Sequence, residues 1–282
     1  MLIAGALALL AGGASAVGGC HQDNHQQVRM LACTAILKSG LAFGPFRAWA
    51  LNSRGLGRYE TRLIVPAIDD FQASIALDPN ARTYNNLANA YRLIGQLQQA
   101  AQHYSLAIAQ RPPYERAYVN RAMIYAALGE HDKALKDAEA AVARQPRNAT
   151  PLTVRGNAKL ALGDTEGALL DQDKAIELRP DFDVPYNNRG CVSLALGQPL
   201  RAVDDFNTAI NIAVDGIETS ARATALFNRA AAETALGQLP QAAASLAQAR
   251  DLDPDVERRL NFQIVTCGST SLAGATPRPP SR

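Results

Sequence analysis

Apolar residues recur at helical spacing along most of the chain, in stretches of about fourteen residues separated by short breaks. The stretches come in pairs that are joined at a glycine and closed by a proline. Glycine suits the end of a helix, where the backbone turns left-handed. Proline cannot continue a helix, because it lacks an amide proton and clashes with the preceding turn. The pattern therefore predicts successive helix pairs, each made of a helix A, a tight turn and a helix B.

The helix pairs form an internal repeat. Gly95, Gly129, Gly163 and Gly197 lie 34 residues apart, and Gly237 follows after 40. Alanine stands five and twelve residues after each of these glycines, and a small residue stands seven before. Proline stands seventeen residues after four of the five. A period of this length predicts a solenoid in which small residues let helix A pack closely on helix B.

The register divides residues 48–254 into repeats, of which the first is degenerate and the fifth is long. Thr61-Arg62 replaces the turn glycine of the first repeat, so its turn must differ. The fifth repeat carries six extra residues around Asp215-Gly216, which predict a lengthened loop. The six predicted repeats are 48–80, 81–114, 115–148, 149–182, 183–222 and 223–256.

The ends of the chain differ from the repeats. A solenoid needs caps with a polar outer face. We expect residues 20–47 to form an N-terminal capping helix and residues 255–266 a C-terminal solvating helix. Residues 267–282, rich in Ser, Pro and Gly, are expected to be a disordered tail.

The repeat resembles the tetratricopeptide (TPR) motif, whose Leu-Gly-x-x-x-x-Ala pattern stands at Leu128–Ala134 and Leu162–Ala168. The resemblance covers roughly residues 81 to 254. It implies an all-α fold, a right-handed superhelical solenoid of about six helix-turn-helix units with a C-terminal capping helix. It also implies a protein or an extended peptide as partner. The segment Leu31–Ile36, with Cys20 before it, resembles the start of secreted bacterial TPR proteins.

One face of each helix A is expected to line the inner groove of such a superhelix. Counted from the first residue of each repeat, asparagine gathers on this face at positions 5, 6 and 9. Its amide offers the donor and the acceptor that a peptide backbone requires, and TPR proteins that hold extended peptides use asparagines on this wall. The alternative is that asparagine simply belongs to the consensus helix. The predicted asparagine row is Asn85, Asn86, Asn89, Asn120, Asn157, Asn187, Asn188 and Asn228.

Other residues on the same face suggest a polarity for the ligand. Three arginines lie towards the N-terminal end of the groove, which we call its front. The apolar residues Met123, Leu160, Leu194 and Phe227 lie further towards its C-terminal end. We expect an acidic or C-terminal group towards the front and apolar side chains behind. The arginines concerned are Arg82, Arg92 and Arg116.

The clamp by which chaperone-binding TPR domains grip a terminal carboxylate is missing. Asn89 and Asn120 match two of its positions. Asn85 replaces its first lysine, and Thr150 and Val154 stand at its last two positions.

A second polar row is expected to be structural. Position 7 carries arginine and position 23 carries aspartate in four repeats, which favours a bidentate pair between helices A and B or across to a neighbouring repeat. A ligand-binding row of arginines is the alternative. Leu87 and His103 replace both residues in repeat two, and Ser245 replaces the aspartate in repeat six. The predicted pairs are Arg54–Asp70, Arg121–Asp137, Arg155–Asp171 and Arg189–Asp205.

Charge and motifs indicate no other class of function. The 28 basic and 26 acidic residues nearly balance and form no basic stripe, which argues against nucleic acid as partner. The sequence has no His-Glu-x-x-His, no phosphate loop and no Cys-x-x-Cys. Cys191 is interpreted as a small buried hydrophobic residue. We therefore predict no enzyme activity, no cofactor and no metal, and leave the oligomeric state open.

Residues 1–19 are uncharged, mostly Leu, Ala and Gly, and suit a signal peptide cut after Ala16. The end of this segment can also be interpreted as a lipobox, with acylation of Cys20 as the only tie to a membrane. A disulfide between Cys20 and Cys33 is the competing prediction, since one sulfur cannot serve both. Export predicts a periplasmic protein or an outer-membrane lipoprotein. Because no Lys or Arg precedes the apolar core, a cytoplasmic adaptor with a mis-assigned start remains the alternative.

Overall fold

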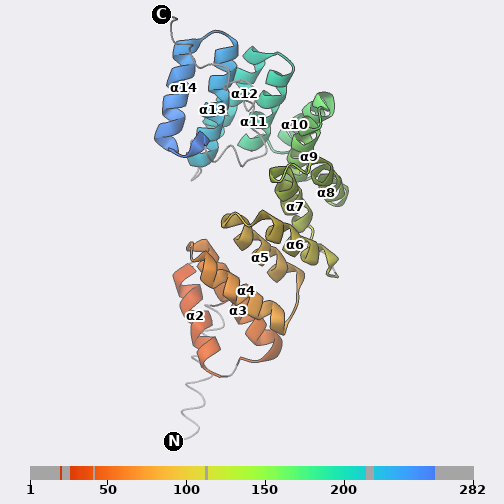
Figure 1. Cartoon of the computed structure of the whole chain (residues 1–282), viewed down its shortest axis with the longest axis vertical. Helices are drawn as coiled ribbons and strands as arrows, with labels where there is room; N and C mark the ends of the chain where they lie inside the picture. Colours follow the sequence, from red (N-terminus) through yellow and green to blue (C-terminus); the bar gives the residue numbers. More distant parts are fainter. Residues whose placement is uncertain (1–19, 21–25, 41, 112–113, 214–218, 258–282) are drawn as a thin grey trace, which may run out of the picture. The chain divides into compact units, whose positions relative to one another are not determined.

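Helices are the only regular secondary structure in the described part of the chain. The computed structural model describes residues 20, 26–40, 42–111, 114–213 and 219–257, and these contain thirteen helices and no strand (Figure 1). The all-α prediction is confirmed. The chain divides into an N-terminal unit, which ends at Ile124, and a C-terminal unit, which begins at Tyr125.

The helices of the N-terminal unit pack in consecutive pairs. Helix α2 packs on α3, α3 pairs with α4, α4 packs on α5, and α5 pairs with α6. This order of contacts is that of a solenoid, in which each hairpin touches the next. The helices are α2 (Gln26–Lys38), α3 (Gly44–Glu60), α4 (Ile64–Leu77), α5 (Ala81–Leu93) and α6 (Leu97–Ala109), and α7 (Arg116–Ala127) begins in this unit.

The C-terminal unit repeats the same arrangement. Helix α8 packs on α9, and three hairpins follow, α9–α10, α11–α12 and α13–α14, each touching the next. The A helices α9, α11 and α13 also contact one another in that order. Its helices are α8 (His131–Arg144), α9 (Ala149–Ala161), α10 (Thr165–Leu178), α11 (Asp183–Ala195), α12 (Pro199–Ile212), α13 (Thr219–Ala235) and α14 (Leu239–Leu252).

The turns between helices A and B follow the glycine pattern. Gly95, Gly163 and Gly197 take φ values between +72° and +86°, and the other turn glycines lie in the same range. In the first repeat Arg62 takes this role with φ +65°. The Leu63 amide donates to the Arg58 carbonyl at 2.8 Å, so the degenerate repeat keeps its hairpin without a glycine.

The interface between helices A and B depends on small residues. The alanines five and twelve residues after each turn glycine are at most 4% exposed. In three repeats the small residue of helix A is a glycine that faces a large side chain of helix B. A Cβ on Gly55 would lie 2.7 Å from the Phe71 ring, and one on Gly190 would lie 2.6 Å from the Phe206 ring. Glycine is therefore required at these two sites by packing.

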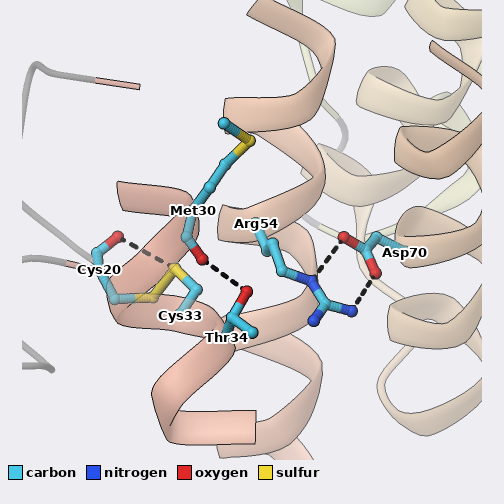
Figure 2. The surroundings of a disulfide bond; sticks show 6 residues. All are labelled: Cys20, Met30, Cys33, Thr34, Arg54 and Asp70. Atoms are coloured by element: carbon cyan, nitrogen blue, oxygen red, sulfur yellow. Dashed lines mark hydrogen bonds and ion pairs between the residues drawn. A yellow bond between two sulfur atoms is a disulfide. The ribbon is translucent and has the colours of Figure 1, made fainter. Parts of the chain in front are cut away.

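The N-terminal cap contains a disulfide and is joined to the first repeat by an ion pair. Cys20 and Cys33 form a disulfide, and the Met30 carbonyl accepts a hydrogen bond from Thr34 at 2.6 Å within α2 (Figure 2). The Arg29 guanidinium lies 3.0 Å from the Glu60 carboxylate on α3. This disulfide is the bond that the sequence offered as the alternative to acylation of Cys20.

Two element boundaries differ from the predicted ones. The expected capping helix over 20–47 is divided, because α2 ends at Lys38 and α3 starts at Gly44, four residues before the predicted repeat. Pro45 lies in the first turn of α3, where its missing amide proton costs no hydrogen bond. Helix α13 likewise begins at Thr219, ahead of the predicted start at residue 223.

Several predictions lie outside the described residues. They are the signal peptide over 1–19, the loop around Asp215-Gly216, the solvating helix beyond Glu257 and the tail over 267–282. Within the described residues, no helix combines the length and the apolar character needed to cross a membrane.

Candidate binding surface on the A helices

The predicted asparagines lie where neighbouring A helices meet, and they bond to one another. Asn86 donates through Nδ2 to Asn52 Oδ1 at 3.0 Å, and Asn120 donates in the same way to Asn85 Oδ1 at 2.9 Å. In the C-terminal unit Asn228 donates to Asn187 Oδ1 at 2.9 Å. The rule is the same each time: position 6 of one repeat donates to position 5 of the repeat before.

This bonding pattern joins consecutive repeats and still leaves hydrogen-bonding capacity. A primary amide has two N–H donors and two oxygen lone pairs, and one Asn–Asn bond uses one donor of one residue and one lone pair of the other. Asn52, Asn86 and Asn120 are half-buried, so their remaining groups can reach a ligand. The structure thus gives these amides a structural role and keeps them available for binding.

Two further asparagines of the row contact helix B of their own repeat. Asn89 Oδ1 accepts a hydrogen bond from the buried Tyr104 hydroxyl at 2.5 Å, and Asn157 Oδ1 accepts one from Gln172 Nε2 at 3.2 Å. Burial raises the pKa of the Tyr104 hydroxyl, and the nearby Arg92 opposes this shift. The hydroxyl therefore stays protonated and fixes the orientation of the Asn89 amide.

The arginines predicted at the front lie beside the half-buried asparagines. Arg82 and Arg116 are exposed, and each stands four residues before an asparagine of the row, Asn86 and Asn120. Residues four apart share one face of a helix. The face of α5 and α7 in the N-terminal unit therefore combines amides with guanidinium groups.

In the C-terminal unit the asparagines of position 6 are covered. Asn188 and Asn228 stand at position 6, as Asn86 and Asn120 do, but they are only 2% and 0% exposed. Asn188 accepts a hydrogen bond from Asn187 at 3.3 Å. Asn188 Nδ2 and Asn228 Oδ1 have no hydrogen-bond partner.

Three of the four predicted arginine–aspartate pairs form within their repeats. The fourth, Arg121–Asp137, stays a prediction. Arg155 contacts Asp171 in bidentate fashion, with Nε to Oδ2 at 2.8 Å and Nη2 to Oδ1 at 2.5 Å. Arg189 contacts Asp205 in the same way, at 3.0 and 2.6 Å. Arg54 and Asp70 form the equivalent pair of the first repeat (Figure 2). The hydrogen bond to Asp171 raises the pKa of Arg155, and that to Asp205 raises the pKa of Arg189.

A second acceptor for these arginines comes from the preceding repeat. Arg189 Nη1 lies 2.8 Å from Asp173 Oδ1, although Asp173 belongs to helix B of repeat four. Arg121 Nη1 donates to Ser105 Oγ at 2.7 Å in the same relation. Both acceptors stand at position 25 of their repeats. Each of these arginines therefore joins helices of two repeats, which assigns it to the structural framework.

Three models of one family match the chain. Each is described as "Tetratricopeptide repeat", and they cover residues 67–115, 115–148 and 149–182. The last two ranges are the third and fourth repeats of the predicted register. The chain is a tetratricopeptide repeat protein. A search of curated proteins gave no significant match.

Solved structures of other TPR proteins share the fold. A TPR protein from Parabacteroides merdae superposes with a TM-score of 0.71 at 14% identity, over 89% of this chain and 98% of that one. One from Thermus thermophilus gives 0.57 at 23% identity, over 64% and 96%. The C-terminal part of a TPR protein from Cytophaga hutchinsonii gives 0.57 at 15%, over 89% and 98%. These structures show the shared fold, and the TPR repeats themselves suggest a protein-interaction scaffold.

Repeat six of this TPR protein contains a carboxylate that the sequence pattern did not reveal. Ser245 replaces the expected aspartate, and its hydroxyl donates to Glu233 at 2.7 Å. Glu233 is buried on α13, four residues after Arg229, and lies 3.3 Å from the Arg229 guanidinium. The helical spacing of Arg229 and Glu233 was the available signal.

Repeat two replaces the ion pair with stacked rings. The His103 ring lies 5.2 Å from Tyr91 at 9° and 6.4 Å from Tyr84 at 21°, measured between centroids. Burial lowers the pKa of His103, and its Nδ1 has no hydrogen-bond partner. In repeat two, stacked neutral rings therefore stand at the place where other repeats have an arginine–carboxylate pair.

The cysteines of this TPR protein are oxidised wherever the structure describes them. Cys20 and Cys33 pair with each other, and Cys191 is also disulfide-bonded. Cys191 is buried as predicted, but it is not the lone thiol that the sequence suggested. Among the described residues, no three His, Cys, Asp or Glu side chains gather as metal ligands would.

Proposed function

We propose that this TPR scaffold is non-catalytic and holds an extended peptide along the A helices of its N-terminal unit. The observation that carries the proposal is the half-buried row Asn52, Asn86 and Asn120, which is oriented by inter-repeat bonds and retains unused donors and lone pairs. Amides with both functions suit the alternating N–H and C=O groups of a peptide backbone. Such a surface holds a chain without selecting most of its side chains.

The arginines on the same face add a charge preference. Arg82 and Arg116 present exposed guanidinium groups one helical turn from Asn86 and Asn120. A guanidinium binds a carboxylate through two parallel hydrogen bonds. The proposed ligand is therefore an extended segment with an acidic side chain or a C-terminal carboxylate opposite repeats two and three.

A footprint by hydrogen exchange tests where a ligand binds. A peptide would be selected against the whole chain from a random library, and amide exchange would be compared with and without it. We expect added protection in α5 and α7, which carry the asparagine row. Protection confined to the B helices α4 and α6 would contradict the proposal.

We further propose that the protein works in the cell envelope after export. All three cysteines in the described residues are in disulfides, and such bonds persist in oxidising compartments such as the periplasm. With its sulfur bonded to Cys33, Cys20 has no thiolate to receive a lipid, which favours cleavage after Ala16 over acylation. The N-terminal segment supplies the other support, since it has the composition of a signal peptide.

Mass spectrometry of the protein isolated from its own cells tests the location. We expect a chain that begins at Val17 and contains an intact Cys20–Cys33 disulfide. A diacylglyceryl group on Cys20 would replace this proposal with the lipoprotein alternative. An intact Met1 with reduced cysteines would favour the intracellular adaptor.

A further inference from the structure

The disulfide at Cys191 has no obvious place in a TPR frame. Cys191 lies on α11, 3% exposed, in an apolar cluster with Phe206 and Ala232. Leu160 of α9 and Leu194 of α11 pack against this cluster. Cys191 stands three residues after Asn188, one turn along the same helix face as the covered asparagine row.

The cysteine count leaves one intrachain partner. The chain has four cysteines, and Cys20 is bonded to Cys33. Because Cys191 is also bonded, Cys267 is the only remaining cysteine. It stands ten residues after Glu257, the last described residue. Ten extended residues span about 33 Å, which is ample for a segment that starts inside the same unit.

The start of that segment is already fixed near the covered surface. Val256 is 0% exposed and belongs to a core cluster with Phe227 of α13 and Ala249 of α14. Tyr186 of α11 packs against the same cluster. The chain therefore leaves the described region beside α13 and α11, the two helices that carry the covered asparagines.

The covered asparagines indicate what kind of group lies over them. Asn188 Nδ2 is a buried donor and Asn228 Oδ1 is a buried acceptor, both without partners. An unpaired buried amide group costs about 1–3 kcal/mol, so a backbone segment that brings C=O and N–H groups would relieve both. The equivalent Asn86 and Asn120 of the N-terminal unit are not covered in this way.

We propose that Cys191 and Cys267 form a disulfide that fixes residues 258–267 along the asparagine row of the C-terminal unit, as an internal ligand. The segment suits the surface, because Phe262, Ile264 and Val265 precede Cys267 and can meet the apolar cluster around Leu160 and Leu194. The bond itself does not depend on the function proposed above. Its consequence does: the chain fills one part of its own peptide-binding wall and leaves the N-terminal part for a partner.

The bond forms by ordinary thiol–disulfide exchange. One cysteine thiolate attacks a low-molecular-weight or protein disulfide and releases one thiol. The second cysteine attacks the resulting mixed disulfide and releases the second thiol. The two cysteines lose two protons and two electrons, and the oxidant disulfide gains them as two thiols.

A peptide map of the whole oxidised chain tests the bond. After alkylation and complete tryptic digestion without reductant, we expect the peptide 190–201 joined to 260–282, and the joined mass to disappear on reduction. Cys191 joined to any other cysteine, or recovered alkylated, would overturn the proposal.

Limited trypsin cleavage after Arg259 tests whether the segment is held. We expect cleavage to be at least about tenfold faster in Cys267→Ser than in wild type, because cleavage follows the population of the open form. The matched control is Cys20→Ser with Cys33→Ser, which removes the other disulfide and should leave this rate unchanged. Equal rates in Cys267→Ser and wild type would overturn the docking. A failed peptide footprint on α5 and α7 would leave both results intact, so the two proposals can fail separately.

Discussion

At the scale of single residues, the asparagines of the A helices act first between repeats. Asn120 donates to Asn85 on the preceding A helix, and Asn85 is buried. The alternative interpretation of the row, that asparagine is a consensus residue of the helix, therefore has a physical basis in these bonds. The proposed binding role depends on the N–H donors and oxygen lone pairs that these bonds do not use.

The pairing predicts an asymmetric response to mutation. Asn120→Val should lower the free energy of unfolding by about 1–3 kcal/mol, because it leaves the buried Asn85 oxygen without a donor. Asn85→Val with Asn120→Val should recover most of this loss, since two apolar groups leave no polar atom unpaired. Valine already occurs at the equivalent contact between repeats three and four. Val119 stands at position 5 of repeat three, and Val154 stands at position 6 of repeat four. Urea denaturation checks this, and a double variant as unstable as the sum of the single ones would refute the pairing.

Protonation of His103 is expected to make the free energy of unfolding depend on pH. Its pKa is lowered from 6.5 by burial between Tyr84 and Tyr91, so below pH 6.5 the unfolded chain binds a proton more readily than the folded one. The free energy of unfolding should therefore fall as the pH is lowered through 6.5 towards the folded pKa. His103→Phe keeps the stacked ring and should remove this contribution. Thermal melts of both proteins between pH 5 and 8 measure the difference, and identical profiles would contradict the assignment.

At the scale of helices, the repeat period allowed the helix pairs, the glycine turns and the Arg–Asp spacing to be predicted. The side-chain contacts between repeats could not be predicted. The repeat period shows on which face of a helix a residue lies, but it does not show which side chain of the neighbouring repeat packs against that face. The acceptors at Ser105 and Asp173 show this, as does Glu233. One signal was present in the sequence: asparagine at position 5 is followed by asparagine at position 6 of the next repeat in three cases, beginning with Asn52 and Asn86.

The buried ion pairs should contribute more than the exposed ones. Arg155→Ala leaves the carboxylate of Asp171, which is 4% exposed, with only Lys159 at 2.9 Å. We expect a loss of about 3 kcal/mol, at the lower end of the cost of breaking a buried pair. Lys174→Ala on the same hairpin removes an exposed pair with Glu177 and should cost less than about 0.5 kcal/mol. Equal losses in denaturant titrations would contradict the structural role of Arg155.

Glycine at the A–B interface is predicted to be required by packing. Gly190→Ala would place a Cβ 2.6 Å from the ring of Phe206, which is fully buried. Overpacking of this kind costs about 1–3 kcal/mol. Phe206→Leu should partly restore stability in the Gly190→Ala background, because the smaller side chain makes room for the methyl group. A melting temperature unchanged by Gly190→Ala, or no rescue by Phe206→Leu, would show that the helices separate freely.

At the scale of the whole molecule, the two units present the same asparagine register in two states. In the N-terminal unit Asn86 and Asn120 are half-buried beside exposed arginines, whereas in the C-terminal unit Asn188 and Asn228 are covered. The sequence predicted one continuous row and could not distinguish the two parts, because exposure depends on which other segments lie over a helix. Repeats two and three are therefore the place to test binding.

The affinity of a selected peptide for the Asn85→Val, Asn120→Val chain tests the central claim most directly. This variant replaces the buried Asn85–Asn120 bond with an apolar contact and removes the half-buried Asn120 amide from the proposed wall, so its fold can be matched to wild type by thermal melting. A dissociation constant at least about tenfold higher than that of wild type, equivalent to about 1.4 kcal/mol, is the predicted result. An unchanged dissociation constant in a variant that is equally folded would contradict peptide binding by the asparagine row.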